Sequence, residues 1–175
     1  TVRYDRRLAT HRAQPVRALE LDGPHVAFET PLAKGVLGVS PSAFVIEVLV
    51  EGRPFVTLQG PDDLPLRAIV DVAIDHAGTL ETLPEETIDK LLRMLRRGIP
   101  KLIVAIAEKM PELIGDPGPA RTLIARWIDR GRLDQAIRDA LAGARAFRTL
   151  QGGRVSIEEA AEPLLVVSIA SWQGE

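Results

Sequence analysis

The sequence predicts an α+β fold, in which a four- or five-stranded, mainly antiparallel or mixed sheet is backed by a long kinked helix. Two observations carry this prediction. Strand-like apolar runs crowd into residues 16–77, and a long helical pattern follows from about residue 85. Strands followed by helices along the chain are typical of α+β domains. We expect a small helical and α/β appendage after the long helix.

The strands are predicted from apolar alternation and from turn residues. Val16–Leu21 and His25–Thr30 are expected to form a hairpin across Asp22-Gly23-Pro24. A second reversal is expected at Glu51-Gly52-Arg53-Pro54, where Gly52 can supply a positive φ. The remaining strands are expected at 36–39, 43–50, 54–58 and 66–74.

A long helix is predicted to begin near residue 83, because Thr82 and Glu85 have the spacing of a capping box and Pro84 suits a first turn. Its apolar residues recur at steps of three and four, as in a helix packed on a sheet. They are Ile88, Leu91, Leu92, Leu95, Ile99, Leu102, Ile103, Ile106 and Met110. Gly98 and Pro100 interrupt the pattern, so we expect a kink or a break there.

The last third of the chain has shorter elements. Helices are expected at Pro119–Arg130 and Leu133–Leu141, and a final strand at Leu164–Ile169 follows a turn at Gly152-Gly153. We therefore divide the chain into a linker or edge segment at 1–15, an α+β domain at 16–114 and a small helical and α/β subdomain at 115–175.

Composition limits the classes of protein to consider. A hydrophobic content of 46% is too high for a disordered chain, and a formal charge of -2 gives no net field that attracts nucleic acid, which is a disfavoured partner. No window of 18 apolar residues is present, so we expect no membrane partner. The absence of cysteine favours a reducing compartment, and we expect a cytoplasmic location. The ratio of 18 Arg to 4 Lys is typical of a GC-rich bacterial genome.

One candidate site is acidic. Asp71 and Asp75 are expected to share one face of a strand, beside His76. Paired carboxylates can perform acid–base chemistry, which would make the chain a small enzyme. The alternative is that they form the solvent-exposed face of a half-buried strand. The histidines are scattered along the chain, so no metal site is expected.

A second candidate site is basic. Arg93, Arg96, Arg97 and Lys101 cluster around the predicted kink, and eight more arginines lie between 121 and 154. They would suit phosphates or an acidic partner, and the chain would then be an Arg-rich interaction module. The alternative is the solvated polar side of amphipathic helices. Lys34 precedes Gly35 in a stretch loosely like a phosphate-binding loop, although it lacks the P-loop ending and a plain turn is favoured.

The order hairpin, strand, Val50-Glu51-Gly52-Arg53-Pro54, strand, long helix resembles the transducer domain of GHKL ATPases, over residues 16–113. Gly52-Arg53 is similar to an Asn-Gly-Arg element of MutL-like proteins. Over residues 145–160, the stretch Phe147-Arg-Thr-Leu-Gln-Gly-Gly-Arg-Val-Ser-Ile157 resembles a segment of large bacterial HtpG-like proteins.

The resemblance implies a middle, transducer or client-interaction domain of an HtpG-like, chaperone-like ATPase. ATP and Mg would bind to an upstream nucleotide-binding domain, the partner in cis, and a protein client would be a further partner. The first residue is Thr, and we read the chain as a segment of such a longer protein. Alone, it would hold no cofactor and have no catalytic activity. In the full-length protein, Lys34 and Arg53 would sense the nucleotide.

Overall fold

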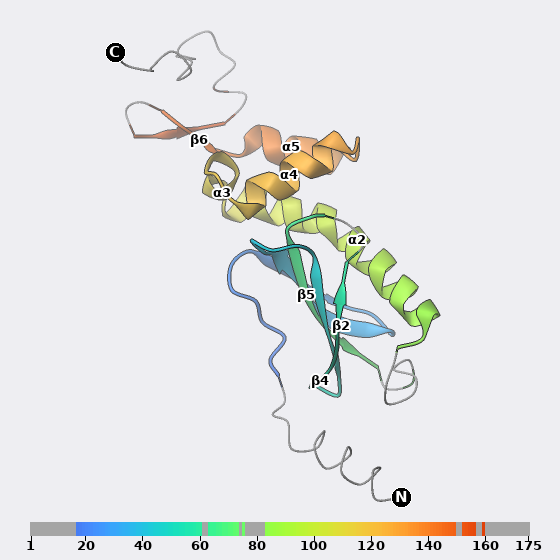
Figure 1. The fold of residues 1–175 in the computed structure, drawn as a ribbon. Helices are drawn as coiled ribbons and strands as arrows, with labels where there is room; N and C mark the ends of the chain where they lie inside the picture. Colours follow the sequence, from blue (N-terminus) through green and yellow to red (C-terminus); the bar gives the residue numbers. More distant parts are fainter. Residues whose placement is uncertain are drawn as a thin grey trace, which may run out of the picture.

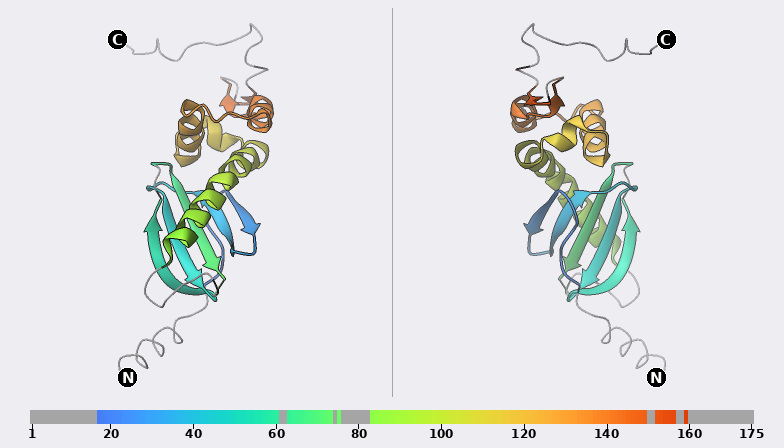
Figure 2. Two further views of the ribbon diagram at one scale, coloured as in Figure 1. Left: turned by 90° about the vertical axis from the view of Figure 1, so that its right-hand side faces the viewer. Right: turned by 90° about the vertical axis from the view of Figure 1, so that its left-hand side faces the viewer.

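The computed structural model describes residues 17–60, 63–73, 75, 83–149, 152–156 and 159. It confirms the α+β fold: a five-stranded mixed sheet lies against one long helix, and shorter helices follow (Figure 1). The helix lies in front of the sheet in one view of Figure 2 and behind it in the other, so it covers a single face.

The sheet consists of two hairpins with one strand between them, in the order β1-β2-β5-β3-β4. The strands are β1 (His25–Glu29), β2 (Ala33–Val39), β3 (Val45–Val50), β4 (Arg53–Gln59) and β5 (Leu66–Val72). β5 pairs parallel to β3, and the other neighbours are antiparallel. The connection from β4 to β5 therefore crosses the start of β3, where Gly60 packs on the Phe44 ring.

The hairpin predicted across Asp22-Gly23-Pro24 is wrong. β1 pairs with β2 instead, and the Thr30 hydroxyl and amide both donate to the Ala33 carbonyl at 2.9 Å to close that turn. Residues 17–24, which we call the covering segment, form no strand, and Leu19 and Leu21 lie on the sheet face opposite the long helix. Leu19 and Leu21 pack there on a small buried cluster. The apolar alternation before residue 22 thus reflects packing on a sheet rather than pairing within it.

The reversal predicted after Val50 is confirmed, and it is tighter than expected. Glu51 and Gly52 form a two-residue turn with φ values of 52° and 72°, so both residues are left-handed, as in a type I′ hairpin turn. Arg53 already belongs to β4. Asp71 on β5 fixes the turn, because its carboxylate accepts a hydrogen bond from the Gly52 amide at 3.1 Å.

The long helix, α2 (Glu85–Lys109), runs for 25 residues without the expected break at Gly98 and Pro100. Its apolar stripe is buried on both sides of Pro100, with Leu95 and Leu102 at 1% and 0% exposure. Burial of several such side chains, at about 1.5–3 kcal/mol each, outweighs a proline cost of about 3 kcal/mol. Pro84 is the N-cap residue, and Thr82 lies outside the described residues.

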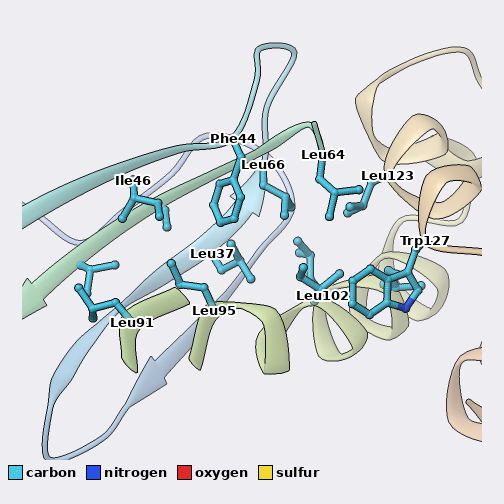
Figure 3. Close-up of a cluster of buried hydrophobic side chains, with 14 of the residues drawn as sticks. Leu37, Phe44, Ile46, Leu64, Leu66, Leu91, Leu95, Leu102, Leu123 and Trp127 are labelled. Atoms are coloured by element: carbon cyan, nitrogen blue, oxygen red, sulfur yellow. The ribbon is translucent and has the colours of Figure 1, made fainter. Parts of the chain in front are cut away.

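The C-terminal part adds α3 (Glu112–Gly115), α4 (Pro119–Asp129), α5 (Gln135–Gly143) and a hairpin of β6 (Phe147–Arg148) with β7 (Arg154–Val155). The strand predicted at Leu164–Ile169 lies outside the described residues. Leu123 and Trp127 of α4 join the same buried cluster as the sheet and α2, beside Leu64 and Leu102 (Figure 3). One core therefore extends from the sheet through α2 into α4 and α5, and the domain boundary after residue 114 stays a prediction.

Candidate functional site

A groove of about 620 Å³ lies between the edge strand β1 and one side of α2. We call it the basic groove. It is lined by residues 26–30 and Leu32 on the strand side and, on α2, by Lys90, Arg93, Met94, Arg97, Gly98 and Lys101. Four of these lining residues are basic and one, Glu29, is acidic.

Two glycines let the walls of the basic groove form. A Cβ on Gly35 of β2 would come 2.8 Å from Phe28 Cζ, so the glycine leaves room for the Phe28 ring on the neighbouring strand. A Cβ on Gly98 of α2 would lie 3.1 Å from Leu37 Cδ2, so this glycine lets the helix approach β2 closely. The groove consequently has an apolar floor in which the side chains of Val26 and Phe28 are half-buried.

The rim of the basic groove is a line of exposed cations. Arg93, Arg97 and Lys101 are four residues apart, so they project from one side of α2 at intervals of about 6 Å along its axis. None of the three forms an ion pair with another described residue. Lys90 is already paired with Glu86, at 2.7 Å. Three positive charges therefore face solvent above an apolar floor.

Arg96, which the sequence grouped with these cations, does not line the groove and is half-buried. One residue corresponds to about 100° of rotation around a helix, so Arg96 cannot share a side with both Arg93 and Lys101. The sequence pattern also missed Lys90, Phe28 and Glu29. Periodicity marked Lys90 as polar and Phe28 as part of a strand, but it could not show that β1 lies beside α2.

Lys34 and Arg53 are not brought together. Lys34 lies within β2, where a turn was favoured, and projects exposed from the face opposite α2, with its Nζ 4.0 Å from Asp71 Oδ2. Arg53 pairs with Val50 and projects from the face that α2 covers, and it is half-buried rather than exposed in a loop. Strands β5 and β3 separate them, which puts their backbones about 14 Å apart. Their role in sensing nucleotide stays a prediction.

The acidic candidate site does not form as expected. β5 ends at Val72, so Asp75 lies beyond the strand and does not share a strand face with Asp71. Asp71 is 12% exposed in its side chain and is occupied by the Gly52 amide and by Lys34. His76 lies outside the described residues. Among the residues that the structure describes, no cluster of His, Asp or Glu side chains suits a metal ion.

Several of the C-terminal arginines bind carboxylates within the chain. Arg126 and Arg130 both reach Asp63, at 3.1 and 2.5 Å. Arg148 and Arg154 both reach Asp116 at 3.2 Å, which ties the β6–β7 hairpin to the end of α3. These residues hold elements together, unlike Arg93, Arg97 and Lys101 of the basic groove.

The pKa of the Asp116 carboxyl is lowered by this ion pairing. Burial raises the pKa of Asp116, but the hydrogen bond from Arg154 and the charges of Arg148 and Arg154 outweigh it, and the pKa falls below the usual 3.8. Arg145 does the same for Glu159, although the Ser156 amide is the larger cause of the lowered pKa there.

The basic groove is the feature that best fits a binding site in the described part of the chain. No helix there is long and apolar enough to cross a membrane. Comparison with protein-family models and with curated proteins gives no match to this chain.

Proposed function

We propose that this chain is the client-binding middle domain of an HtpG-like ATPase, and that it holds an acidic segment of a protein client in the basic groove. The observation that carries the binding role is the line of Arg93, Arg97 and Lys101 above the half-buried floor of Val26 and Phe28. An extended acidic peptide offers carboxylates to the cations and aliphatic carbon to the floor.

A protein partner fits this surface better than a nucleic acid does. The net charge of the chain is -2, so attraction to a polyanion would depend on one short row of cations. Phe28 is the aromatic residue among those that line the groove, and it lies over Gly35 instead of presenting a free ring for a base to stack on. The enzyme alternative has less support, because Asp71 is occupied by the turn of the β3–β4 hairpin.

Charge reversal in the basic groove tests the binding role. We expect a fluorescein-labelled peptide with alternating Glu and Val to bind the chain, with fluorescence anisotropy as the readout. Arg93→Glu with Arg97→Glu should weaken binding by at least about tenfold, because each reversal replaces an attraction with a repulsion of similar size. The control pair is Arg121→Glu with Arg138→Glu, two exposed arginines on α4 and α5. An equal loss in both double variants would contradict a specific site.

The continuous core supports a second part of the proposal, in which the domain passes a movement of the sheet on to the C-terminal helices. α2 packs on the sheet and, through Leu102, on α4, so a displacement of the sheet would be transmitted to the C-terminal helices. In the full-length protein, Lys34→Ala should slow ATP turnover while leaving the melting temperature nearly unchanged, since Lys34 is exposed. Arg53 is half-buried, so Arg53→Ala also removes packing. ATP turnover in this variant is therefore compared with that in Arg53→Lys, which keeps the positive charge.

Unaltered turnover in Lys34→Ala and Arg53→Ala would contradict the nucleotide-sensing part of the proposal. The isolated chain should show no heat above dilution when it is titrated with ATP and Mg. A micromolar dissociation constant for ATP would contradict the proposal that ATP binds to an upstream nucleotide-binding domain and not to this chain.

A further inference from the structure

β1 forms one edge of the sheet in the described part of the chain, because it pairs with β2 alone. Two hydrogen bonds show which residues of β1 point their backbone groups toward β2. The Thr30 amide donates to the Ala33 carbonyl at 2.9 Å, and the Val39 amide donates to the Pro24 carbonyl at 3.2 Å. Hydrogen-bonded pairs alternate along an antiparallel ladder, so the backbone of every second residue from 24 to 30 faces β2.

The remaining residues of β1 therefore direct their backbone groups away from the sheet. These residues are His25, Ala27 and Glu29. Each has an N–H, and β1 contains neither proline nor a bulge. An edge of this kind is a template for another strand. Residues 26–29 of β1 border the basic groove, so the open edge and the cations of α2 belong to one site.

We propose that the acidic client segment binds by strand addition, pairing its backbone with the outer edge of β1 beneath the cations of α2. This inference rests on the proposed function and specifies its binding mode. Alternate side chains on one face of an added strand are about 6.7 Å apart. Arg93, Arg97 and Lys101 are about 6 Å apart along α2. A segment with acidic residues at every second position matches that row of cations.

The opposite edge of the sheet explains why β1 is the acceptor. β4 carries Pro54, which has no N–H, and its pairing with β3 shifts register between Val48 and Leu49. Proline and bulges are features that prevent edge pairing in natural sheets. None of the residues that line the basic groove, with its row of cations, belongs to β4. The two edges thus differ in both backbone and charge.

The occupant is further limited by Glu29. Its carboxylate is exposed at the end of β1 next to the turn, where it would repel an acidic side chain placed directly opposite it. Binding should therefore favour a segment whose acidic residues face α2 and whose other face is uncharged. This pattern separates strand addition from simple attraction between opposite charges, which depends on charge and not on its spacing.

Two sets of variants test strand addition with the fluorescein-labelled Glu and Val peptide, of about seven residues. Ala27→Pro removes an outward N–H without removing a bond to β2, and Ala27→Thr is the control that keeps the N–H. In the second set the protein is unchanged, and the peptide is N-methylated at one or the other set of alternate backbone nitrogens. A peptide of the same composition with its Glu residues contiguous tests spacing.

Strand addition predicts that Ala27→Pro weakens binding by about tenfold or more while Ala27→Thr does not. It also predicts that N-methylation at one set of alternate backbone nitrogens abolishes binding, whereas N-methylation at the other set leaves binding nearly intact. If Ala27→Pro fails to fold, the comparison of the two N-methylated peptides still tests strand addition. Normal binding by Ala27→Pro, or equal binding of the two N-methylated peptides, would overturn strand addition and leave the charge-based function standing.

Two further outcomes would contradict the proposed function as well as strand addition. No binding of the unmodified peptide to the wild-type chain would overturn the proposed function together with this inference. Tighter binding of a single-stranded oligonucleotide than of the peptide would assign the groove to nucleic acid and contradict a protein segment as its occupant.

Discussion

The two faces of the five-stranded sheet are covered in different ways. The face toward α2 belongs to a cluster that includes Leu37, Leu95 and Leu102 and extends into α4 and α5. The opposite face has a small cluster of Val36, Leu49 and Ile69, on which Leu19 and Leu21 of the covering segment pack. The first face is held by a helix with its own hydrogen bonds, whereas the covering segment is anchored at few points.

The charged residues of the two faces differ as well. On the face opposite α2, Glu47 accepts from both Arg17 and Arg67, and the Arg17 amide donates to the Gly52 carbonyl at 2.8 Å. The Arg17 contacts hold the covering segment, and the pair of Arg67 with Glu47 joins β5 to β3. At the rim of the α2 face, Arg93 and Arg97 have no such use among the described residues. The larger buried cluster and the unpaired cations of the basic groove thus lie on the same side of the sheet, that of α2.

The largest expected effect is on the α2 face. Leu102 is fully buried between the sheet and α4, so Leu102→Ala should lower the free energy of unfolding by about 2–5 kcal/mol. Urea denaturation followed by circular dichroism measures this change. Leu95→Ala, about two turns earlier on the same stripe, should fall in the same range. A cost below about 1 kcal/mol would show that α2 does not pack as described.

A smaller effect is expected on the opposite face. Leu21 is partly buried, so Leu21→Ala should cost about 1 kcal/mol in the same denaturation experiment. The covering segment would still be held through Arg17. If Leu21→Ala cost as much as Leu102→Ala, the two faces would contribute equally and the comparison would fail.

The rim of the basic groove should contribute least to folding. Arg97 is exposed, so Arg97→Ala should change the free energy of unfolding by less than about 0.5 kcal/mol while it weakens binding of the acidic peptide. Anisotropy and urea denaturation on the same preparation separate the two effects. A large loss of stability would mean that Arg97 is part of the fold and not of a binding site.

The ion pairs of Asp116 give a pH-dependent prediction. Because the folded pKa lies below 3.8, the stabilising contribution is complete at neutral pH, above the unfolded pKa, and is lost only as the pH falls through the folded value. A carboxyl carbon NMR titration should give Asp116 a midpoint below 3.8, and Arg154→Ala should raise it. A midpoint at or above 3.8 in the wild-type chain would contradict the ion pairs.

The fold class and the α2 stripe were predictable because periodicity reports local burial. Leu95 and Leu102 repeat at helical spacing and are buried as expected. The strand order was not predictable, since nothing local indicates that β5 enters between the two hairpins. The covering segment was misread for the same reason: Leu19 and Leu21 alternate as in a strand, whether they pair within a sheet or pack across one.

The site was predictable only in part. The cations of α2 stand out in the sequence, and their four-residue spacing already places Arg93, Arg97 and Lys101 on one side. Their significance depends on β1 beside them, which is a tertiary contact. Asp71 shows the opposite case: a carboxylate that suggested chemistry is engaged by the backbone of a turn nineteen residues away in sequence.

The basic groove between β1 and α2 is proposed to hold an acidic extended segment. The most direct measurement is a two-dimensional amide NMR titration of the chain with the Glu and Val peptide. If the groove holds such a segment, the largest shifts will fall on residues 25–29 of β1 and on α2 from Lys90 to Lys101. Largest shifts on β4, or on the arginines of α4 and α5, would contradict it.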